Sequence, residues 1–447
     1  MAVANENSAQ KWALPFFTIW SGQTFSLLGS QLVQFALIWW LTRTTGSATV
    51  LATASLIGLL PQVFIMPLAG ALVDRWSRRV TMILADSLIA LATVALAVMF
   101  WSGEVQVWQV YLLMFIRSAA GGFHWSAMQA STSLMVPQRH LSRIQGLNQT
   151  TNGGLNIISA PLGALLLELL PIQGVLAIDV GTALLAITPL FFFHVPQPRR
   201  AAADEAGGDT SVWQDFKAGF KYAAGWPGLV MIGVMATMIN LLLTPAFSLL
   251  PILVIKHFNG QAFHLAWLES GLGIGIVVGG LLLSAWGGFK RRILTSMLGL
   301  LLIGGSALAI GLAPASAFTF TVGAIFITGL ATPLTNGPIF AVLQSVVEPG
   351  MQGRVFTLLV SAATAMTPLG LVIAGPVADA FGVQSWFILG GLMTAGMGLA
   401  GCFIPAVVNI ENNHASGPLD EPDAPRLDKH PAAAVQATAA SQPTETE

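Results

Sequence analysis

Apolar runs of about 20 residues recur along nearly the whole of this 447-residue chain. Each run is long enough to cross a hydrocarbon layer roughly 30 Å thick as a helix. Charged residues make up only 9% of the sequence, against about 25% in soluble proteins, so a charged surface cannot be built. The short alternating segments of a membrane β-barrel are absent, and a lipid-exposed backbone must satisfy its own hydrogen bonds. The sequence therefore predicts an all-α polytopic membrane protein.

Twelve spans can be counted from the hydropathy pattern. They are expected at 13–42, 48–73, 79–101, 106–134, 144–169, 173–195, 227–255, 263–287, 292–313, 317–346, 354–380 and 384–408. The first apolar run is too long for the core of a signal peptide, so no cleaved signal is expected. Cys402 is the single cysteine, which excludes a disulfide within the chain.

The spans divide into two groups of six, which predicts two six-helix halves at 1–195 and 227–408. Residues 196–226 break the apolar rhythm and are expected to form a cytoplasmic linker. One helical face of this linker is apolar with lysines beside it, through Trp213, Phe216, Phe220, Lys217 and Lys221. This pattern favours a short helix in the membrane interface over a soluble linker helix. Residues 409–447 are rich in Ala, Pro and acidic residues without periodicity, and are expected to be disordered.

Weak repeats relate the two halves. Ala160-Pro161-Leu162-Gly163 is echoed by Thr367-Pro368-Leu369-Gly370, and Phe115-Ile116-Arg117 by Phe326-Ile327-Thr328. Such internal repeats are typical of transporters with two pseudo-symmetric halves and a binding site between them near the bilayer midplane.

The placement of positive charge predicts the orientation. If the N-terminus is cytoplasmic, sixteen of the nineteen lysines and arginines fall in inside segments. The outside segments hold only Arg43 and Lys256, and Arg117 lies within a span. By the positive-inside rule, both termini are expected in the cytoplasm.

The loop between the second and third spans reads Gly70-Ala71-Leu72-Val73-Asp74-Arg75-Trp76-Ser77-Arg78-Arg79. It resembles the loop signature of the major facilitator superfamily, Gly-x-Leu-x-Asp-Arg-x-Gly-Arg-Arg, with Ser77 in place of the second glycine. The resemblance implies a secondary transporter in which this loop latches the cytoplasmic side, through Gly70, Asp74, Arg75, Arg78 and Arg79. Asp74 is placed to interact with the positive N-terminus of the third span. The alternative is that these charges serve only to orient the chain.

Arg117 lies about ten residues into the fourth span, where a charge must face a cavity or a partner. With Gly121 it resembles the family's fourth-span signature, Arg-x-x-x-Gly, which is linked with proton movement. The structural alternative is a buried pair with Asp86 of the third span.

Intramembrane acids are the candidates for proton coupling, because an apolar site lets a carboxyl bind and release a proton near neutral pH. Glu269 is the first choice as carrier, followed by Asp179 and Asp86. Asp179 has the alternative role of a hydrogen-bonded group in helix packing. Asp379 is expected to be wet, near an outer helix end.

The fifth span contains Gly154, Pro161 and Gly163, which loosely resemble the family's antiporter signature, Gly-x-x-x-Gly-Pro-x-x-Gly. This resemblance implies export rather than uptake. Ordinary packing through small residues is the alternative.

By family resemblance, spans 1, 4, 7 and 10 line the substrate cavity. Their polar residues are Gln23, Ser30, Gln31, Gln34, His124, Asn240, Thr332 and Asn336. Polar groups among many Phe, Trp and Met residues suit a bulky, mostly apolar ligand with few polar anchors. The alternative is that each of these residues only ties helices together.

Several chemistries have no motif in this sequence. There is no phosphate loop for ATP hydrolysis, no zinc spacing among the histidines and the cysteine, and no Gly-x-Ser-x-Gly nucleophile elbow. The chain is therefore expected not to be an enzyme, and to have no cofactor, metal or nucleic-acid partner.

Beyond the superfamily, the chain resembles the bacterial macrolide efflux proteins of the Mef type. The resemblance runs through most of residues 12–408, in Phe17 to Gln23, Thr45 to Ala48, Val73 to Arg75, Phe115 to Ser118, Ala177 to Val180 and Gly353 to Phe356. It implies a monomer in the bacterial cytoplasmic membrane that exports macrolide-like drugs, driven by the proton gradient. The alternatives are export of a siderophore or other amphipathic metabolite, or a transport-inactive sensor or scaffold.

Overall fold

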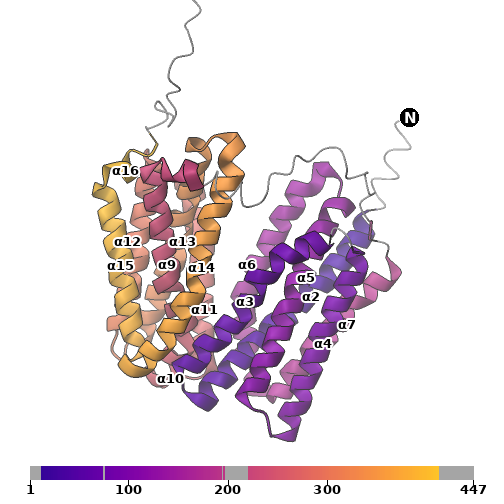
Figure 1. Cartoon of the computed structure of the whole chain (residues 1–447). Helices are drawn as coiled ribbons and strands as arrows, with labels where there is room; N and C mark the ends of the chain where they lie inside the picture. The colour runs from indigo at the N-terminus through magenta and orange to yellow at the C-terminus, as the bar shows by residue number, and fades with distance from the viewer. Residues whose placement is uncertain (1–11, 74–75, 194, 197–219, 412–447) are drawn as a thin grey trace, which may run out of the picture.

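The computed structural model describes residues 12–73, 76–193, 195–196 and 220–411, and within them every regular element is a helix (Figure 1). The first half contains α2 (Ala13–Thr45), α3 (Ala48–Val73), α4 (Arg78–Ser102), α5 (Val107–Met135), α6 (Gln138–Leu169) and α7 (Ile172–Phe192). The second half contains α9 (Pro227–Ser248), α10 (Leu250–Lys256), α11 (Ala262–Trp286), α12 (Arg292–Leu312), α13 (Phe318–Val346), α14 (Pro349–Phe381), α15 (Val383–Phe403) and α16 (Pro405–Val408).

Nine helices of the described residues are long and apolar enough to cross a membrane. This confirms the prediction of an all-α, multi-pass membrane protein. The long helices α3, α5 and α6 fall outside that set. α5 and α6 are less apolar because they carry polar residues such as Arg117 and Asn148 on their inner faces.

Prolines account for two differences from the expected spans. The seventh span is divided into α9 and α10 at Leu249, two residues before Pro251. Proline has no N–H and its ring clashes with the preceding turn, which favours a break there, although other described helices contain prolines such as Pro161 and Pro245. The last span ends at Phe403 for the same reason, because Pro405 begins α16. Two further helices begin earlier than expected, α6 at Gln138 and α14 at Pro349.

The packed chain of the second half continues to Glu411. Ile410 is buried against Gly228, and Glu411 Oε1 accepts a hydrogen bond from Ile293 N, at 2.9 Å, in the first turn of α12. A carboxylate at a helix N-terminus satisfies an otherwise unpaired donor. Of the expected interfacial face, Phe220 is exposed in a short helical segment at 220–224; Trp213, Phe216 and Lys217 lie outside the described residues.

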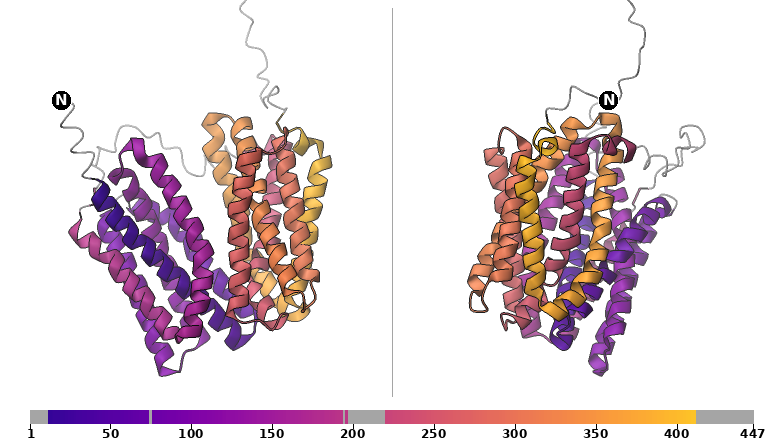
Figure 2. Two further views of the ribbon diagram at one scale, coloured as in Figure 1. Left: turned by 180° about the vertical axis from the view of Figure 1, so that it is seen from behind. Right: turned by 60° about the vertical axis from the view of Figure 1, so that its left-hand side comes forward.

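The two halves form separate bundles that lie side by side (Figures 1 and 2). We call the end at which the described chain starts and finishes the termini end, and the opposite one the far end. The connections after α3, α5, α11 and α13 lie at the termini end, and those after α2, α4, α6 and α10 at the far end. Among the described residues, Arg78, Arg79, Arg291 and Arg354 belong to the termini end.

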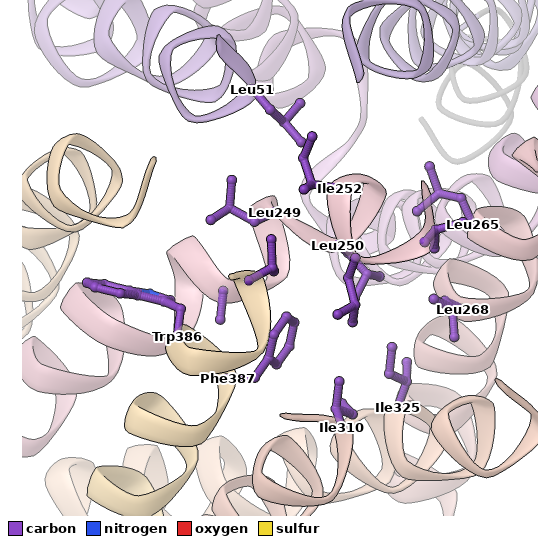
Figure 3. Close-up of a cluster of buried hydrophobic side chains, with 14 of the residues drawn as sticks. Leu51, Leu249, Leu250, Ile252, Leu265, Leu268, Ile310, Ile325, Trp386 and Phe387 are labelled. Atoms are coloured by element: carbon purple, nitrogen blue, oxygen red, sulfur yellow. The ribbon is translucent and has the colours of Figure 1, made fainter. Parts of the chain in front are cut away.

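A hydrophobic cluster closes the far end between the halves (Figure 3). The first half contributes Leu51 and Trp39, and the second half contributes Leu249, Ile252 and Phe387, all buried. Direct contact of this kind excludes water and lipid from the junction. The halves are therefore joined at the end remote from the chain termini.

Asp379 of α14 clasps the N-terminus of α3 at this closed end. Its carboxylate accepts hydrogen bonds from Ala48 N at 2.8 Å, Thr49 N at 2.9 Å and Ser47 Oγ at 2.9 Å. The two backbone N–H groups are unpaired donors of the first turn of α3, where the dipole favours an anion. Lys256 Nζ lies 3.9 Å away and is half-exposed, so its contribution is small. Asp379 is thus a bonded group that joins the halves, rather than a simply hydrated one.

Glycines allow the closest helix approach in the second half. Gly275 and Gly279 of α11 face Gly329 and Leu330 of α13, and a β carbon at either α11 glycine would overlap backbone atoms of α13. Small residues at helix crossings are typical of packing within a bilayer.

Asp379→Ala is expected to lower the free energy of unfolding by about 1 kcal/mol, the usual cost of losing a helix N-cap. Asp379→Asn should cost less, because one acceptor oxygen remains. Thermal unfolding of the purified protein measures both. Glu104→Ala, which removes an exposed carboxyl from the far-end connection after α4, is the matched control. Equal stability of Asp379→Ala and the control would mean that the clasp contributes nothing.

Candidate functional site

A cavity of about 690 Å³ lies on the inner side of the first half; its wall is mostly apolar, and we call it the polar cavity for the buried polar side chains that it contains. Its walls come from α2, α3, α4 and α5, and its lining includes Gln23, Ser26, Ser30, Gln34, Ser55, Gly58, Asp86, Met114, Arg117, Ser118, His124 and Trp125. Its volume lies in the range of sites for drug-sized ligands. Within the described residues, no group of three His, Cys, Asp or Glu side chains could hold a metal ion.

A hydrogen-bonded group of three side chains forms one wall of this cavity. Gln23 Nε2 donates to Asp86 Oδ2 at 3.0 Å, and Gln23 Oε1 lies 2.8 Å from His124 Nε2. His124 Nε2 also approaches Asp86 Oδ1, at 3.5 Å. All three side chains are buried, with Asp86 only 3% exposed. Three helices, α2, α4 and α5, thus place an acid, an amide and an imidazole together at the cavity wall.

Arg117 pairs with Asp179, so the alternative of a pair with Asp86 is not what the structure shows. Arg117 Nη1 lies 2.7 Å from Asp179 Oδ2. The same carboxylate accepts hydrogen bonds from Thr93 Oγ1, at 2.8 Å, and Ser30 Oγ, at 3.2 Å. Asp179 is fully buried, and a buried charge is tolerated only when paired and hydrogen-bonded. α7 reaches this position because Gly29 of α2 leaves room for it; a β carbon there would meet Asp179 and Thr182.

This network joins α2, α4, α5 and α7. Its geometry fits the alternative role of Asp179, that of a hydrogen-bonded group in helix packing. Arg117 reaches the cavity wall, but its charge is balanced by Asp179. Asp86 is therefore the acid of the described cavity lining, and the arginine of that lining is paired with Asp179 instead.

Glu269 lies on α11, in the second half, away from these two groups. It is partly buried, between Leu265 and Gly273 along the helix, and Gly273 packs against Ile157 of α6. Among the described residues, no hydrogen bond or ion pair to Glu269 is present. Glu269 thus lies close to the junction of the halves and has no bonding partner among the described residues. Asp179, in contrast, accepts bonds from three side chains.

The candidate cavity residues separate into three groups. Gln23, Gln34 and His124 line the polar cavity. Asn240 and Asn336 line a smaller pocket of about 170 Å³ within the second half. Asn240 is also tied to α14, because Thr367 Oγ1 donates to its Oδ1 at 3.3 Å. Gln31 and Thr332 lie in neither lining, and the Thr332 hydroxyl donates to Thr328 O of its own helix. The residues expected around one cavity therefore divide between two pockets, and Gln31 and Thr332 line neither of them.

Arg78 and Arg79, in the first turn of α4 directly after the loop, bind carbonyls of their own half. Arg78 is buried, and its Nη1 donates to Ala130 O of α5 at 2.6 Å. Arg79 Nη2 donates to Phe191 O, in the last turn of α7, at 2.9 Å, where carbonyls lack helical partners. Gly70 lies near the end of α3. Asp74 and Arg75 lie outside the described residues. Arg78 and Arg79 therefore do more than orient the chain, since they tie α4 to α5 and α7.

The small residues of α6 have different surroundings. A β carbon at Gly163 would lie 2.8 Å from the Phe35 ring, so this glycine permits close contact with α2. Gly154 has open space around it. Pro161 lies inside the helix and borders an apolar groove between α6 and α11. Only Gly163 has the close approach that small-residue packing requires.

Thr93 and Ser118 were not among the expected site residues. Thr93 bonds Asp179, and the Ser118 hydroxyl donates to Gly58 O of α3 at 2.6 Å. Thr93 follows Asp86 by seven residues, a spacing that puts both on one helical face. That spacing is the signal in the sequence that could have identified Thr93.

Two side-by-side bundles of membrane-crossing helices, one of them with a cavity lined by buried polar side chains, are the architecture of a membrane transport protein. The sequence profile described as Major Facilitator Superfamily matches residues 19–370. The chain belongs to this superfamily.

Relatives and solved structures agree with this assignment. The chain is 34% identical to macrolide efflux protein A of Streptococcus pyogenes over 86% of this chain and 94% of that protein. It is 32% identical to macrolide efflux protein A of Enterococcus faecalis over 73% of this chain and all of that protein. A bacterial homologue of the human lysosomal transporter Spinster shares the fold, with a TM-score of 0.64 and 13% identity over 90% of this chain and 96% of that chain.

The Arg117–Asp179 pair yields a prediction about stability. Arg117→Met leaves a buried carboxylate unpaired and should cost roughly 3–5 kcal/mol of unfolding free energy. Arg117→Met combined with Asp179→Leu should recover most of that loss, because no lone charge remains. Thermal unfolding of the purified single and double variants measures the coupling. Additive losses in the double variant would show that the two side chains do not act as a pair.

Proposed function

We infer that this protein exports bulky, mostly apolar drugs of the macrolide class across the bacterial cytoplasmic membrane. The observation that carries the proposal is the cavity of about 690 Å³, whose wall combines a few convergent polar groups with apolar side chains. Two relatives with more than 30% identity are named as macrolide efflux proteins, which supports the same substrate class.

Exchange of drug for protons is the proposed energy source. Buried carboxyls are the groups with which a membrane protein carries protons. Glu269 remains our first candidate as carrier, because its carboxyl has no partner among the described residues. Asp86 is the second, because it lines the cavity. Asp179, with three donors around it, and Arg117 fit a supporting role that keeps the cavity wall in place.

The loop between α3 and α4 is proposed to act as a latch on the cytoplasmic side. In the present conformation Arg78 and Arg79 bind carbonyls of their own half. Closing the termini end would bring the second half within reach of this loop. The motif of α6, with Pro161 beside the groove between α6 and α11, fits the export direction that the family resemblance implies.

Accumulation of a labelled macrolide in cells tests the proposed function. Cells expressing the wild-type protein should accumulate severalfold less drug than vector controls, and a protonophore should remove the difference. Glu269→Gln should behave like the vector, because a carboxamide cannot carry a proton. Glu168→Gln, which changes an exposed carboxyl at the far end of α6, is the matched control and should export normally.

Each outcome of this experiment bears on a separate part of the proposal. Equal accumulation in wild-type cells and vector controls would refute macrolide export. Siderophores and other amphipathic molecules would then be tested as substrates. Export that survives the protonophore would refute proton coupling. Export by Glu269→Gln would remove Glu269 as the carrier.

The orientation is proposed from the positive charges at the termini end, which we place in the cytoplasm. In a Cys402→Ala background, Glu104→Cys is exposed at the far end and Gln138→Cys at the termini end. A membrane-impermeant maleimide added to spheroplasts should label the variant at 104 and spare the one at 138 until the membrane is opened. The reverse labelling would invert the topology.

A further inference from the structure

A second pocket, of about 150 Å³, adjoins the polar cavity on the side of the termini end, with walls from α2, α5 and α6. The two spaces share the lining residues Gln23, Leu27, His124 and Trp125. We call the second one the amide pocket, because its lining contains Gln23, Gln129, Gln145, Asn148, Gln149 and Asn152. Sites for whole drug-sized molecules begin at about 300 Å³. The amide pocket therefore has the size for one group attached to a larger ligand in the neighbouring cavity.

Four of these amides form one face of α6. Gln145, Asn148, Gln149 and Asn152 are spaced by three and four residues, the spacing at which the side chains of a helix lie one above the other. The two glutamines are exposed, and the two asparagines are partly buried. Amide side chains are costly against lipid, so a row of them in a membrane bundle belongs on an open polar space. The helix thus presents a continuous row of amides to the pocket.

Most of this hydrogen-bonding capacity is not used within the protein. Trp20 Nε1 donates to Asn148 Oδ1 at 2.8 Å. Because an indole N–H only donates, the oxygen of this amide faces Trp20, and its NH₂ group remains available to a ligand. Among the described residues, no hydrogen bond to the side chains of Gln129, Gln149 or Asn152 is present. Each of these amides can both donate to and accept from a bound molecule.

The amide pocket has no ionised wall. Its described lining contains no Asp, Glu, Lys or Arg side chain, and His124 lies at the boundary with the polar cavity, where it faces Gln23. An ionised group of a ligand would lose hydration here without gaining an opposite charge. A hydroxyl, in contrast, donates and accepts just as an amide does. Trp20 and Trp125, the latter 42% exposed, add aromatic surface for the apolar side of such a group.

We propose that the amide pocket binds a neutral, hydroxyl-bearing group of the substrate, an uncharged sugar, while the apolar body of the substrate occupies the polar cavity. The inference rests on the proposed export function and adds the chemistry of one part of the substrate. A sugar ring has hydroxyls on its rim and C–H groups on its faces. The rim matches the row of amides on α6, and the faces match the tryptophan rings.

Binding of two matched ligands to the purified protein in nanodiscs tests this assignment. The first is a tritiated macrolide that carries one neutral sugar and one amino sugar; the second is the same compound after hydrolysis of the neutral sugar alone. The wild-type protein should bind the first compound about tenfold more tightly, because each neutral hydrogen bond contributes a factor of a few in affinity and the pocket offers several. The ratio of the two affinities is the sugar preference.

Side chains of similar size without an amide separate the amide pocket from the rest of the site. Asn152→Leu and Gln149→Met should each lower the sugar preference severalfold and leave binding of the hydrolysed compound unchanged. Asn156→Leu is the matched control, because Asn156 is the next asparagine on α6, is exposed and lies outside the linings of both spaces. This control should keep the sugar preference. Gln149 is exposed as well, so its variant is expected to fold even if Asn152→Leu does not.

The comparison of the two compounds on the wild-type protein requires no variant. Equal affinities there would overturn the sugar site and leave macrolide export standing. A sugar preference that survives in both Asn152→Leu and Gln149→Met would also overturn it, because the sugar would then bind elsewhere. Loss of the preference in Asn156→Leu would assign the effect to α6 as a whole and overturn the role of the pocket. Failure of the wild type to bind either compound would overturn the proposed function and this inference together.

Discussion

The first half is organised by one buried carboxylate. Asp179 lies at the centre of a bilayer-spanning bundle, and three donors from three other helices, Arg117, Thr93 and Ser30, surround it. Because an unpaired charge is intolerable there, these four helices are held in one mutual arrangement. The arrangement also fixes the inner faces of α2, α4 and α5. Arg117 and Asp86 both line the cavity, and the network pairs Arg117 with Asp179.

The contact between the halves follows a different principle. At the far end, an apolar cluster that includes Leu51, Leu249 and Phe387 is supplemented by the Asp379 carboxylate on the first turn of α3. Both interactions depend on close approach and are lost when the surfaces separate. The Asp86 group, by contrast, belongs to one half and can remain assembled when the halves move. In this protein the polar networks thus lie within the first half, and the contacts described between the halves lie at the far end.

Much of the fold could be predicted from the sequence, because the length and polarity of the spans are local properties. The ends of α3 and α13 fall within a residue of the expected ones, and Pro251 and Pro405 explain the two divided spans. The bonding partners of individual buried side chains were harder to predict from the sequence. The arginine of the fourth span was expected to need an acid, but the choice between Asp86 and Asp179 depends on which helices are neighbours. Residues 197–219 of the linker, and Asp74 and Arg75 of the loop, lie outside the described residues.

The sequence by itself determined that the chain crosses a membrane as helices, that it has two related halves and that its intramembrane charges need partners. These conclusions follow from solvation, since each residue's cost in lipid depends mainly on its own chemistry. Only the tertiary structure decided that Arg117 meets Asp179, that Asp86 meets Gln23 and His124, and that Asn240 belongs to another pocket. Those pairings depend on the rotation and crossing of helices. Glycine contacts such as Gly29 with α7 and Gly163 with α2 set them, and residues far apart in the chain must be packed before their geometry exists.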